Sequence, residues 1–423
     1  MDTAHRRLRS VAGHLFEPET PFADAIDTVP ALRQSSESSS YPIVIIGGMV
    51  LDIVAKPDAH PNPATTTPGK VEYLSGGVAR NVAECMTKLG SKPFMISVVG
   101  FDMAGDLLLK FWESAELPTE GILKLKITTT PVVSNIFDRK GELFAAVASV
   151  CAVEKFLSPD WISKFRHRIQ SAPALMVDAN LHPDSLEAAC RIAFDSGTPV
   201  WFEPVSVTKS ARIASIVDYV TCTSPNENEL IAMANALSSG EQFNSAPGGT
   251  HSIQSSFNLL GPAIQLLMKK GIKLLVVTLG EDGLFLCFRE AADFTARIAK
   301  SREDSVYQNR KLYDLVDKYC PSQLHESLLS LERVNSQEPC VVHFPALRAS
   351  VVSLTGAGDC LVGGILSSLC SGLDIIRSTA VGVAMARAAV EAFDNVPADI
   401  SLIEIALEAG QILSAGRELL LCW

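Results

Sequence analysis

The chain has 423 residues, of which 47% are hydrophobic and 20% charged, a balance typical of a globular protein with a sizeable core. Its formal net charge of −11 comes from 36 basic and 47 acidic residues, and without a basic stripe we expect no nucleic-acid partner. Ten cysteines are scattered without a C-x-x-C pair and no apolar run is long enough to span a bilayer, so neither a disulfide framework, a zinc site nor a membrane span is predicted.

Residues 1–41 are predicted to be a targeting and linker segment ahead of the folded domain. The order Arg7-Leu8, five residues, His14-Leu15 resembles the N-terminal type-2 peroxisomal targeting signal, and its spacing places these side chains near one helical face. A mitochondrial or plastid leader and a chance match are the alternatives. We therefore expect a peroxisomal import receptor as a partner and a peroxisomal location, or otherwise a cytoplasmic one.

From residue 42 onward, apolar strand patterns alternate with helix patterns that end at glycines. Such alternation implies a mostly parallel sheet covered by helices on both faces, so 42–423 is predicted to form an α/β domain of three layers. Strands are expected at 43–47, 94–100, 174–178, 199–203, 217–222 and 273–279, and the clearest helices at 81–89 and 186–196.

Turn-rich segments at about 54–75 and 128–148 break this alternation. Their short strand patterns predict a small β-sheet standing off the main sheet as a lid. Its exposed edges offer pairing to a second copy, so we expect a homodimer through the lid. Stretches 236–259 and 289–339 are predicted to be surface insertions.

Ligands of parallel α/β sheets bind beyond the carboxyl ends of the strands. Polar side chains follow several of the expected strands at this edge. They are Asp52, 178–180, 203–206, 224–229 and 278–283.

The most informative run, V-V-S-L-T-G-A-G-D, ends at Asp359. An extended apolar lead-in meets Gly356, Ala357 and Gly358, and a helix pattern follows. Glycines allow close backbone approach, and unpaired N–H groups at a helix N-terminus bind anions. An acid there can accept a proton from a hydroxyl while the N–H groups hold a phosphoryl group. Taken alone, the run is equally compatible with an ordinary helix start in which Asp359 is a first-turn acid.

A second run, G-G-V-A-R-N at 76–81, also brings glycines to a helix start, and Ala83, Gly90 and Gly100 follow it. Together the two runs resemble the two signatures of the ribokinase-like (pfkB) carbohydrate kinase family, the later one fitting from Gly356 through 363–365. The resemblance covers about 42 to the C-terminus. It implies a ribokinase-like three-layer α/β/α sandwich with a mostly parallel central sheet and a small β-sheet lid, and it implies ATP and Mg²⁺.

The resemblance also assigns roles to matching positions. In catalysis, Gly356, Ala357 and Gly358 would form the anion hole, and Asp359 would be the base. Acceptor hydroxyls would be held by Asp52, Gly76, Gly77 and Asn81. The nucleotide would meet Asn226 and Glu229 of an N-x-x-E motif, with Glu229 holding Mg²⁺ through water, and also Thr278, Gly280, Gly283 and Thr355. The alternatives are helix caps for Asp52 and Asn81 and an exposed helix acid for Glu229.

Ser353 and Leu354 depart from the family pattern, in which many members have Asp and then Thr or Ser. That Asp contributes to a monovalent-cation site beside the anion hole. Ser353 keeps a carbonyl and a hydroxyl but no charge, so potassium activation is in doubt.

Within the family, runs 68–81, 177–180 and 202–209 are most similar to members that act on pseudouridine. Buried polar groups that match a pyrimidine ring would penalise acceptors lacking it. Candidates for the base are Arg80, Asp178, Asn180, Lys70 and Ser134, with Lys209 directed toward the phosphates. Each is equally compatible with a structural role. The alternatives are a kinase of this family for ribose, adenosine, inosine or a hexose, or a non-catalytic member used for binding or assembly.

Overall fold

The computed structural model describes residues 43–61, 64–138, 143–240, 242–244, 252–289, 298, 310–320 and 339–419. The predicted targeting segment, with Arg7-Leu8 and His14-Leu15, lies outside these residues, as does much of both predicted insertions. In the part of the chain that is described, no helix is both long and apolar enough to cross a membrane.

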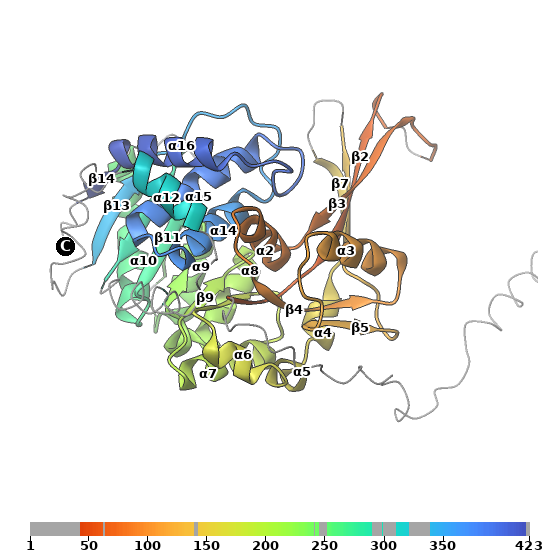
Figure 1. Cartoon of the computed structure of the whole chain (residues 1–423), viewed down its shortest axis with the longest axis horizontal. Coiled ribbons are helices and arrows are strands. Elements are labelled where there is room, and N and C mark those ends of the chain that lie inside the picture. The colour runs from red at the N-terminus through yellow and green to blue at the C-terminus, as the bar shows by residue number, and fades with distance from the viewer. Residues whose placement is uncertain are drawn as a thin grey trace, which may run out of the picture. The chain divides into compact units, whose positions relative to one another are not determined.

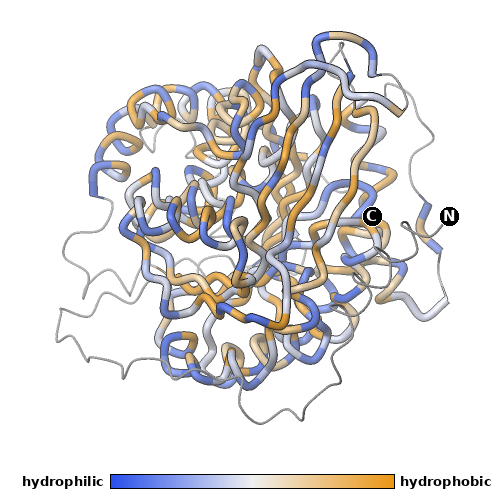
Figure 2. The backbone as a smooth tube through the Cα atoms, turned by 90° about the vertical axis from the view of Figure 1, so that its right-hand side faces the viewer, coloured by the Kyte–Doolittle hydropathy of each residue, from blue (hydrophilic) through white to orange (hydrophobic). Residues whose placement is uncertain are grey.

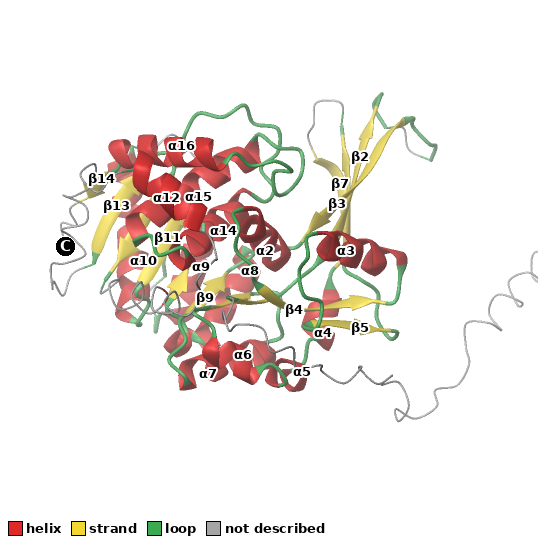
Figure 3. Ribbon diagram, viewed as in Figure 1, coloured by secondary structure: helices red, strands yellow, loops and turns green. Residues whose placement is uncertain are grey.

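A ten-stranded sheet is the centre of the fold (Figures 1 and 3), in the order β14-β13-β12-β11-β10-β9-β8-β1-β4-β5. Neighbours from β11 to β5 pair in parallel, whereas β12, β13 and β14 are added antiparallel at one edge. The strands are β1 (Val44–Ile46), β4 (Phe94–Gly100), β5 (Ile122–Leu125), β8 (Leu175–Asp178), β9 (Val200–Glu203), β10 (Cys222–Thr223), β11 (Leu274–Thr278), β12 (Leu284–Phe288), β13 (Cys340–Phe344) and β14 (Arg417–Leu419).

The central strands are apolar throughout because helices cover both faces of the sheet. Successive side chains point to opposite faces, so Ile45 belongs to one hydrophobic cluster while Val44 and Ile46 belong to another. Orange and blue residues alternate along the helices (Figure 2), and buried apolar residues of the helices belong to these two clusters. One face carries α2 (Val78–Lys88), α3 (Met103–Ser114), α14 (Ala357–Cys370), α15 (Ile375–Val390) and α16 (Leu402–Ala415); the other carries α4 (Cys151–Phe156), α5 (Pro159–Ser163), α6 (Arg166–Ser171), α7 (Pro183–Asp195), α9 (Glu227–Leu237) and α10 (Ile253–Lys269).

The predicted three-layer fold is therefore confirmed, with one strand much shorter than expected. Residues 217–222 were expected to be extended, but Val217–Tyr219 forms a 3₁₀ turn and only Cys222 and Thr223 pair with the sheet. Val217 and Tyr219 pack against the core from this turn, so their apolar character serves packing without a strand.

A separate four-stranded sheet, the lid, projects from the main sheet (Figure 1) in the order β3-β2-β6-β7. β2 pairs antiparallel with β3 and parallel with β6, and β6 pairs antiparallel with β7. The strands are β2 (Val50–Pro57), β3 (Gly69–Gly76), β6 (Val132–Phe137) and β7 (Leu143–Ser149). Since β2 begins at Val50, before the expected boundary near 54, Asp52 is part of the lid.

Parts of both predicted insertions pack against the core of the domain. Helix α12 (Arg310–Tyr319) lies within 289–339, and its Leu312 and Val316 are fully buried on one side. Cys320 continues this stripe and donates a hydrogen bond from Sγ to the carbonyl oxygen of Ala406 at 3.3 Å. The last part of 236–259 belongs to α10, which begins at Ile253. An amphipathic helix inside a charged segment thus packs on the domain.

Candidate active site

The N-terminus of α14 presents backbone N–H groups to open space. Gly356 precedes the helix with φ 83°, and a Cβ there would lie 2.0 Å from the carbonyl oxygen of Asn395, so only glycine fits. A Cβ at Gly358 would meet nothing within 4 Å. Unpaired N–H groups at a helix start carry partial positive charge, so an anion can approach this turn closely.

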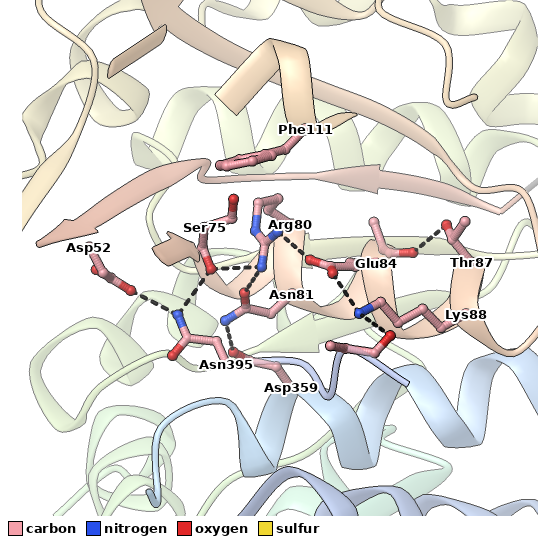
Figure 4. A network of polar contacts seen from close by, with 12 residues as sticks. Asp52, Ser75, Arg80, Asn81, Glu84, Thr87, Lys88, Phe111, Asp359 and Asn395 are labelled. Atoms are coloured by element: carbon pink, nitrogen blue, oxygen red, sulfur yellow. Dashed lines mark hydrogen bonds and ion pairs between the residues drawn. The ribbon is translucent and has the colours of Figure 1, made fainter. Parts of the chain in front are cut away.

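Asp359 lies in this first turn, where Asn81 of α2 holds it. Asn81 Nδ2 donates to Asp359 Oδ2 at 2.6 Å, and Arg80 Nη2 donates to Asn81 Oδ1 at 2.5 Å. Arg80 also pairs with Glu84 one turn along the helix. Figure 4 shows the resulting chain of polar contacts between α2 and α14. Asn81 is therefore not a helix cap, and the two signature runs meet side chain to side chain.

Burial raises the pKa of Asp359 to about 6. The hydrogen bond from Asn81 and the charge of Arg80 oppose this rise, whereas Asp178 and Asp52 add to it through repulsion. The carboxyl group is therefore mostly ionised above neutral pH and protonated in mild acid. A pKa in this range suits a group that takes up a proton during turnover.

Other buried carboxyl groups surround this one. Asp178 is fully buried and accepts hydrogen bonds from the backbone N–H groups of Gly48 and Asn180, both at 2.9 Å. Glu203 accepts a hydrogen bond from Ser224; burial raises its pKa well above the ordinary value, and repulsion from Asp359, Glu229 and Asp178 raises it further. Several acids therefore lie close enough to Asp359 to repel its charge.

Asp52 faces the same region from the lid. Its Oδ2 accepts a hydrogen bond from Asn395 Nδ2 at 2.8 Å, and a Cβ at Gly76 would lie 2.2 Å from the same oxygen. Burial raises the pKa of Asp52, although Asn395 and Arg80 oppose the rise. Gly77, with φ 97°, begins α2 against the carbonyl oxygen of Gly48. The glycine pair thus lets the lid carboxylate and the start of α2 come close together.

Strand register decides which lid residues share the face of Asp52. Side chains directly opposite one another in a sheet point the same way. Val54, two residues beyond Asp52, pairs with Asn135, whereas Ser134 pairs with Ile53 and so lies on the other face. Lys70 shares the face of Asp52 near the far end of β2 and forms an ion pair with Glu72. Hence the lid brings Lys70 and Asn135 to this side and does not bring Ser134.

Three other predicted polar residues hold protein groups in this structure. Arg80 is 4% exposed and its contacts go to Ser75, Asn81 and Glu84. Asp178 binds backbone N–H groups, as described above. Lys209, on α8 (Val207–Ser210), donates from Nζ to Asn180 Oδ1 at 2.6 Å. Asn180 is partly exposed, so the Lys209–Asn180 pair can still meet a ligand.

The expected nucleotide residues lie around α9 and β11. Asn226 caps α9 in a reciprocal pair with Glu229: Glu229 N donates to Asn226 Oδ1, and Asn226 N donates to Glu229 Oε2, both at 2.9 Å. Glu229 is only 7% exposed, which excludes the exposed-acid alternative, and burial raises its pKa. Asn226 also bridges to Thr278, which joins the N-x-x-E motif to β11.

Backbone geometry shapes the turn after β11. Gly280 has φ 60°, and a Cβ there would meet nothing within 4 Å. Gly283 has φ 92°, and a Cβ there would lie 2.0 Å from the carbonyl oxygen of Phe344. Gly283 is therefore packed against Phe344, whereas the space beside Gly280 is open. A nucleotide can approach the backbone of the turn at Gly280. Thr355 N donates to Ser353 Oγ at 3.2 Å, so the Ser353 hydroxyl is engaged locally.

The residues present are compatible with a magnesium ion that is held mainly by substrate phosphates. Among the described residues, no group of three or more His, Cys, Asp or Glu side chains is arranged to hold a metal. Mg²⁺ commonly keeps several waters and one or two carboxylates besides substrate phosphates. Glu229, buried beside the turn after β10, is compatible with such a water-mediated role.

Two residues of this site were not predicted as functional. Asn395 follows α15 within the turn sequence D-N-V-P, which carries no ligand signature. Asn135 lies one residue from the predicted Ser134, and only the register of β6 with β2 distinguishes the two. Together these features bring an anion-binding turn, an ionisable acid and a lid carboxylate into one site. That arrangement suits transfer of a phosphoryl group to a hydroxyl.

Comparison with known proteins gives consistent matches. The model for the "pfkB family carbohydrate kinase" matches residues 42–304 and 336–396. A pseudouridine kinase of Arabidopsis thaliana is 46% identical over 380 residues, covering 89% of this chain and 98% of that protein. A pseudouridine kinase of Escherichia coli K12 is 24% identical over 57% of this chain and 72% of its own length. The structure of an Arabidopsis thaliana ribokinase complexed with ribose and ATP aligns with TM-score 0.62 at 16% identity, covering 87% of this chain and 99% of that one.

Proposed function

This chain belongs to the pfkB family of carbohydrate kinases, and on that premise we propose that it is an ATP-dependent pseudouridine kinase. Membership makes it a phosphotransferase that acts on an alcohol group of a sugar or nucleoside. The observation that carries the finer proposal is the 46% identity with a pseudouridine kinase over 98% of that protein. The reaction would transfer the γ-phosphoryl group of ATP to the ribose 5′-hydroxyl of pseudouridine.

In the proposed mechanism Asp359 is the base. Its ionised carboxylate accepts the proton of the 5′-hydroxyl as that oxygen attacks the γ-phosphorus and the bond to the bridging oxygen of ADP breaks. The N–H groups of Gly356, Ala357 and Gly358 hold the transferring phosphoryl oxygens, which carry the developing charge. Asn81 keeps the Asp359 carboxylate oriented through the 2.6 Å hydrogen bond to Oδ2.

The nucleotide side of the proposal uses the turns after β10 and β11. Asn226 and Glu229 would organise Mg²⁺, water and phosphates; Lys209 and Thr355 would contact phosphates; and Thr278, Gly280 and Gly283 would line the nucleotide. A bound Mg²⁺ would supply neutralisation of phosphate charge there.

On the acceptor side, we propose that Asp52 holds ribose hydroxyls, with Gly76, Gly77 and Asn81 shaping that end of the pocket. The base edge would meet Asn180 and the lid, where Lys70 and Asn135 share the face of Asp52. Asp178 and Arg80 would act from behind these residues by holding backbone and neighbouring side chains, whereas Ser134 lies on the other face of the lid sheet. A closing lid would exclude water and limit ATP hydrolysis.

The test of the acceptor is a comparison of kcat/KM for pseudouridine, uridine, ribose, adenosine and inosine under identical conditions. We expect pseudouridine to exceed each of the others by about 10²-fold or more, since buried polar groups left unpaired by the wrong ring carry a large penalty. A preference for ribose or adenosine would move the chain to another branch of the family. No turnover with any of them would support a non-catalytic role.

We further propose a homodimer through the lid. Every residue of β7 is exposed although it includes Leu143, Phe144 and Val147, and β7 is an edge strand with unpaired backbone groups. Light scattering should then give twice the mass of one chain, and Val147→Glu should give monomers with unchanged helix content. A monomeric wild type would refute the dimer.

Peroxisomal import is proposed from Arg7-Leu8 and His14-Leu15, which lie outside the described residues. A fusion of residues 1–41 to a fluorescent protein should enter peroxisomes, and the same fusion with Arg7→Ala and His14→Ala should remain in the cytosol. Entry into mitochondria or plastids, or no import at all, would contradict the proposal.

A further inference from the structure

Asn395 lies in the turn between α15 and α16, outside both signature runs, yet it is almost fully buried at 4% exposure. A buried amide must find partners for its donors and acceptor. The partners that Asn395 finds are not those of its own turn. They belong to the lid and to the anion-binding turn.

The side chain of Asn395 is directed to the base of the lid. Its Nδ2 donates to Asp52 Oδ2 at 2.8 Å and to the carbonyl oxygen of Ser75 at 3.1 Å. Gly76 makes room for this arrangement, since a Cβ there would come within 3.2 Å of Nδ2. Within the described part of the chain, no hydrogen bond reaches Asp52 Oδ1. One carboxylate oxygen is therefore fixed while the other remains for a ligand.

The main chain of Asn395 reaches the opposite side of the site. Its carbonyl oxygen lies against Gly356, where a Cβ would be 2.0 Å away, and it accepts a hydrogen bond from Cys360 Sγ at 3.6 Å. One residue thus contacts the lid carboxylate through its side chain and the anion-binding turn through its backbone.

A continuous hydrogen-bond path continues from Asn395 to the proposed base (Figure 4). Ser75 O accepts from Asn395 and also from Arg80 Nη2 at 2.8 Å. Arg80 in turn donates to Asn81, which donates to Asp359. The two carboxylates therefore share a common framework of fixed donors, and such support is what keeps reactive groups within the narrow tolerances of catalysis.

We propose that Asn395 is a positioning residue for the acceptor, which orients the Asp52 carboxylate so that Oδ1 meets the acceptor hydroxyls beside Asp359. The inference rests on the proposed acceptor-binding role of Asp52. Because only the side chain contacts Asp52, the side chain of Asn395 serves the acceptor and its backbone serves the anion hole. Substitution of the side chain must then weaken acceptor binding selectively and leave ATP binding intact.

The first test is Asn395→Ala. With the loss of a hydrogen bond to a charged group, the acceptor KM should rise roughly tenfold to a hundredfold. The KM for ATP should stay within about threefold, and kcat at saturating acceptor should fall much less than kcat/KM. Asn235→Ala is the control for the same chemical change at an exposed position, since it removes hydrogen bonds between α9 and Phe243, away from this network. If Asn395→Ala raises the KM for ATP as much as the KM for the acceptor, the role of Asn395 is merely structural and the proposal is overturned.

The second test is Asn395→Asp, which preserves shape and places a carboxyl group at hydrogen-bond distance from Asp52. Two such carboxyls cannot both ionise cheaply. The acceptor dissociation constant, measured by calorimetry with a non-hydrolysable ATP analogue, should be near wild type at about pH 5.5 and much weaker at about pH 8. Other charged groups lie near this pair in the wild type as well: Arg80 from α2, Asp359 from α14 and the adjacent Asp394. Each dissociation constant of the variant is therefore divided by the wild-type constant at the same pH. If this ratio of acceptor dissociation constants does not change with pH, the positioning role is refuted, even when the alanine variant does not fold.

Both tests use whichever acceptor the wild type phosphorylates best. A failure of the pseudouridine assignment therefore leaves them intact. Conversely, an enzyme that prefers pseudouridine but shows an unchanged acceptor KM in both variants would overturn only the role of Asn395.

Discussion

Removal of the amide that holds Asp359 should shift the pH dependence of the enzyme. Asn81 Nδ2 donates to Asp359 Oδ2 at 2.6 Å, and this bond lowers the pKa of a carboxyl group that burial has raised to about 6. Asn81→Ala deletes the donor and leaves the burial. Since the hydrogen bond favours the charged form, its loss must move the pKa upward.

The size of the shift follows from the strength of such bonds. Hydrogen bonds to charged groups contribute about 1.5–3 kcal/mol, and we take the lower end because Asp359 is partly exposed. One pKa unit corresponds to about 1.4 kcal/mol, so the acid limb should move by about one unit, from about 6 to about 7. At pH 6 the ionised fraction then falls about fivefold, beyond any loss that is independent of pH.

The measurement is kcat/KM against pH for wild type, Asn81→Ala and Asn81→Asp. The acid limb of this profile reports the pKa of the base in the free enzyme. Asn81→Asp adds a negative charge beside Asp359 and should shift the limb at least as far. Asn258→Ala, on the exposed side of α10, makes the same chemical change without a shift. Identical acid limbs in wild type and both Asn81 variants would refute the view that this hydrogen bond controls the ionisation of the base.

Three further predictions concern the anion turn, the core and a buried acid. Gly356→Ala should lower the melting temperature, because φ is 83° and a Cβ would lie 2.0 Å from a carbonyl oxygen. Gly358→Ala should melt like wild type and still lose most turnover, because its Cβ enters the empty space where an anion is expected. Leu312→Ala should lower the free energy of unfolding by about 2–5 kcal/mol in chemical denaturation, and Asp314→Ala should lower it by less than about 0.5 kcal/mol. Equal effects of the two substitutions would contradict the packing of α12 on the core. Because the pKa of Glu203 is raised well above 4.5, the folded protein keeps a proton there that the unfolded chain releases, so its contribution to stability falls as pH rises above the ordinary value. Glu203→Gln should therefore gain stability relative to wild type in melts at alkaline pH, and a constant difference across pH would contradict this.

The layered fold could be predicted because apolar strands and helices alternate with clear glycine stops. The prediction of individual elements failed where tertiary packing, and not local sequence, determines the secondary structure. Val217 was expected in a strand because it is apolar, but it packs from a 3₁₀ turn. Helix α12 was missed because its apolar stripe, Leu312 and Val316, is short and surrounded by charged residues.

The candidate site could be predicted in part, to the extent that it lies in runs with local signatures. Asp359 and Asn81 were found from two glycine-rich helix starts, and the structure joins them directly. Asn395 could not be found, because its proposed role depends on a contact with Asp52, which lies far away in the chain. Ser134 was named from the sequence without the strand register, which sets the face of each side chain and is not readable from one strand; the register places Asn135 on the face of Asp52.

The central claim is that Asp359 takes the acceptor proton during phosphoryl transfer to pseudouridine, and Asp359→Asn tests it most directly. Pseudouridine turnover at saturating substrates should fall by about 10³-fold or more, because loss of a general base typically costs about 10²–10⁴. The dissociation constant for ATP should change by less than about threefold, since the anion-binding N–H groups belong to the backbone. Turnover within about tenfold of wild type, with ATP still bound, would contradict the account.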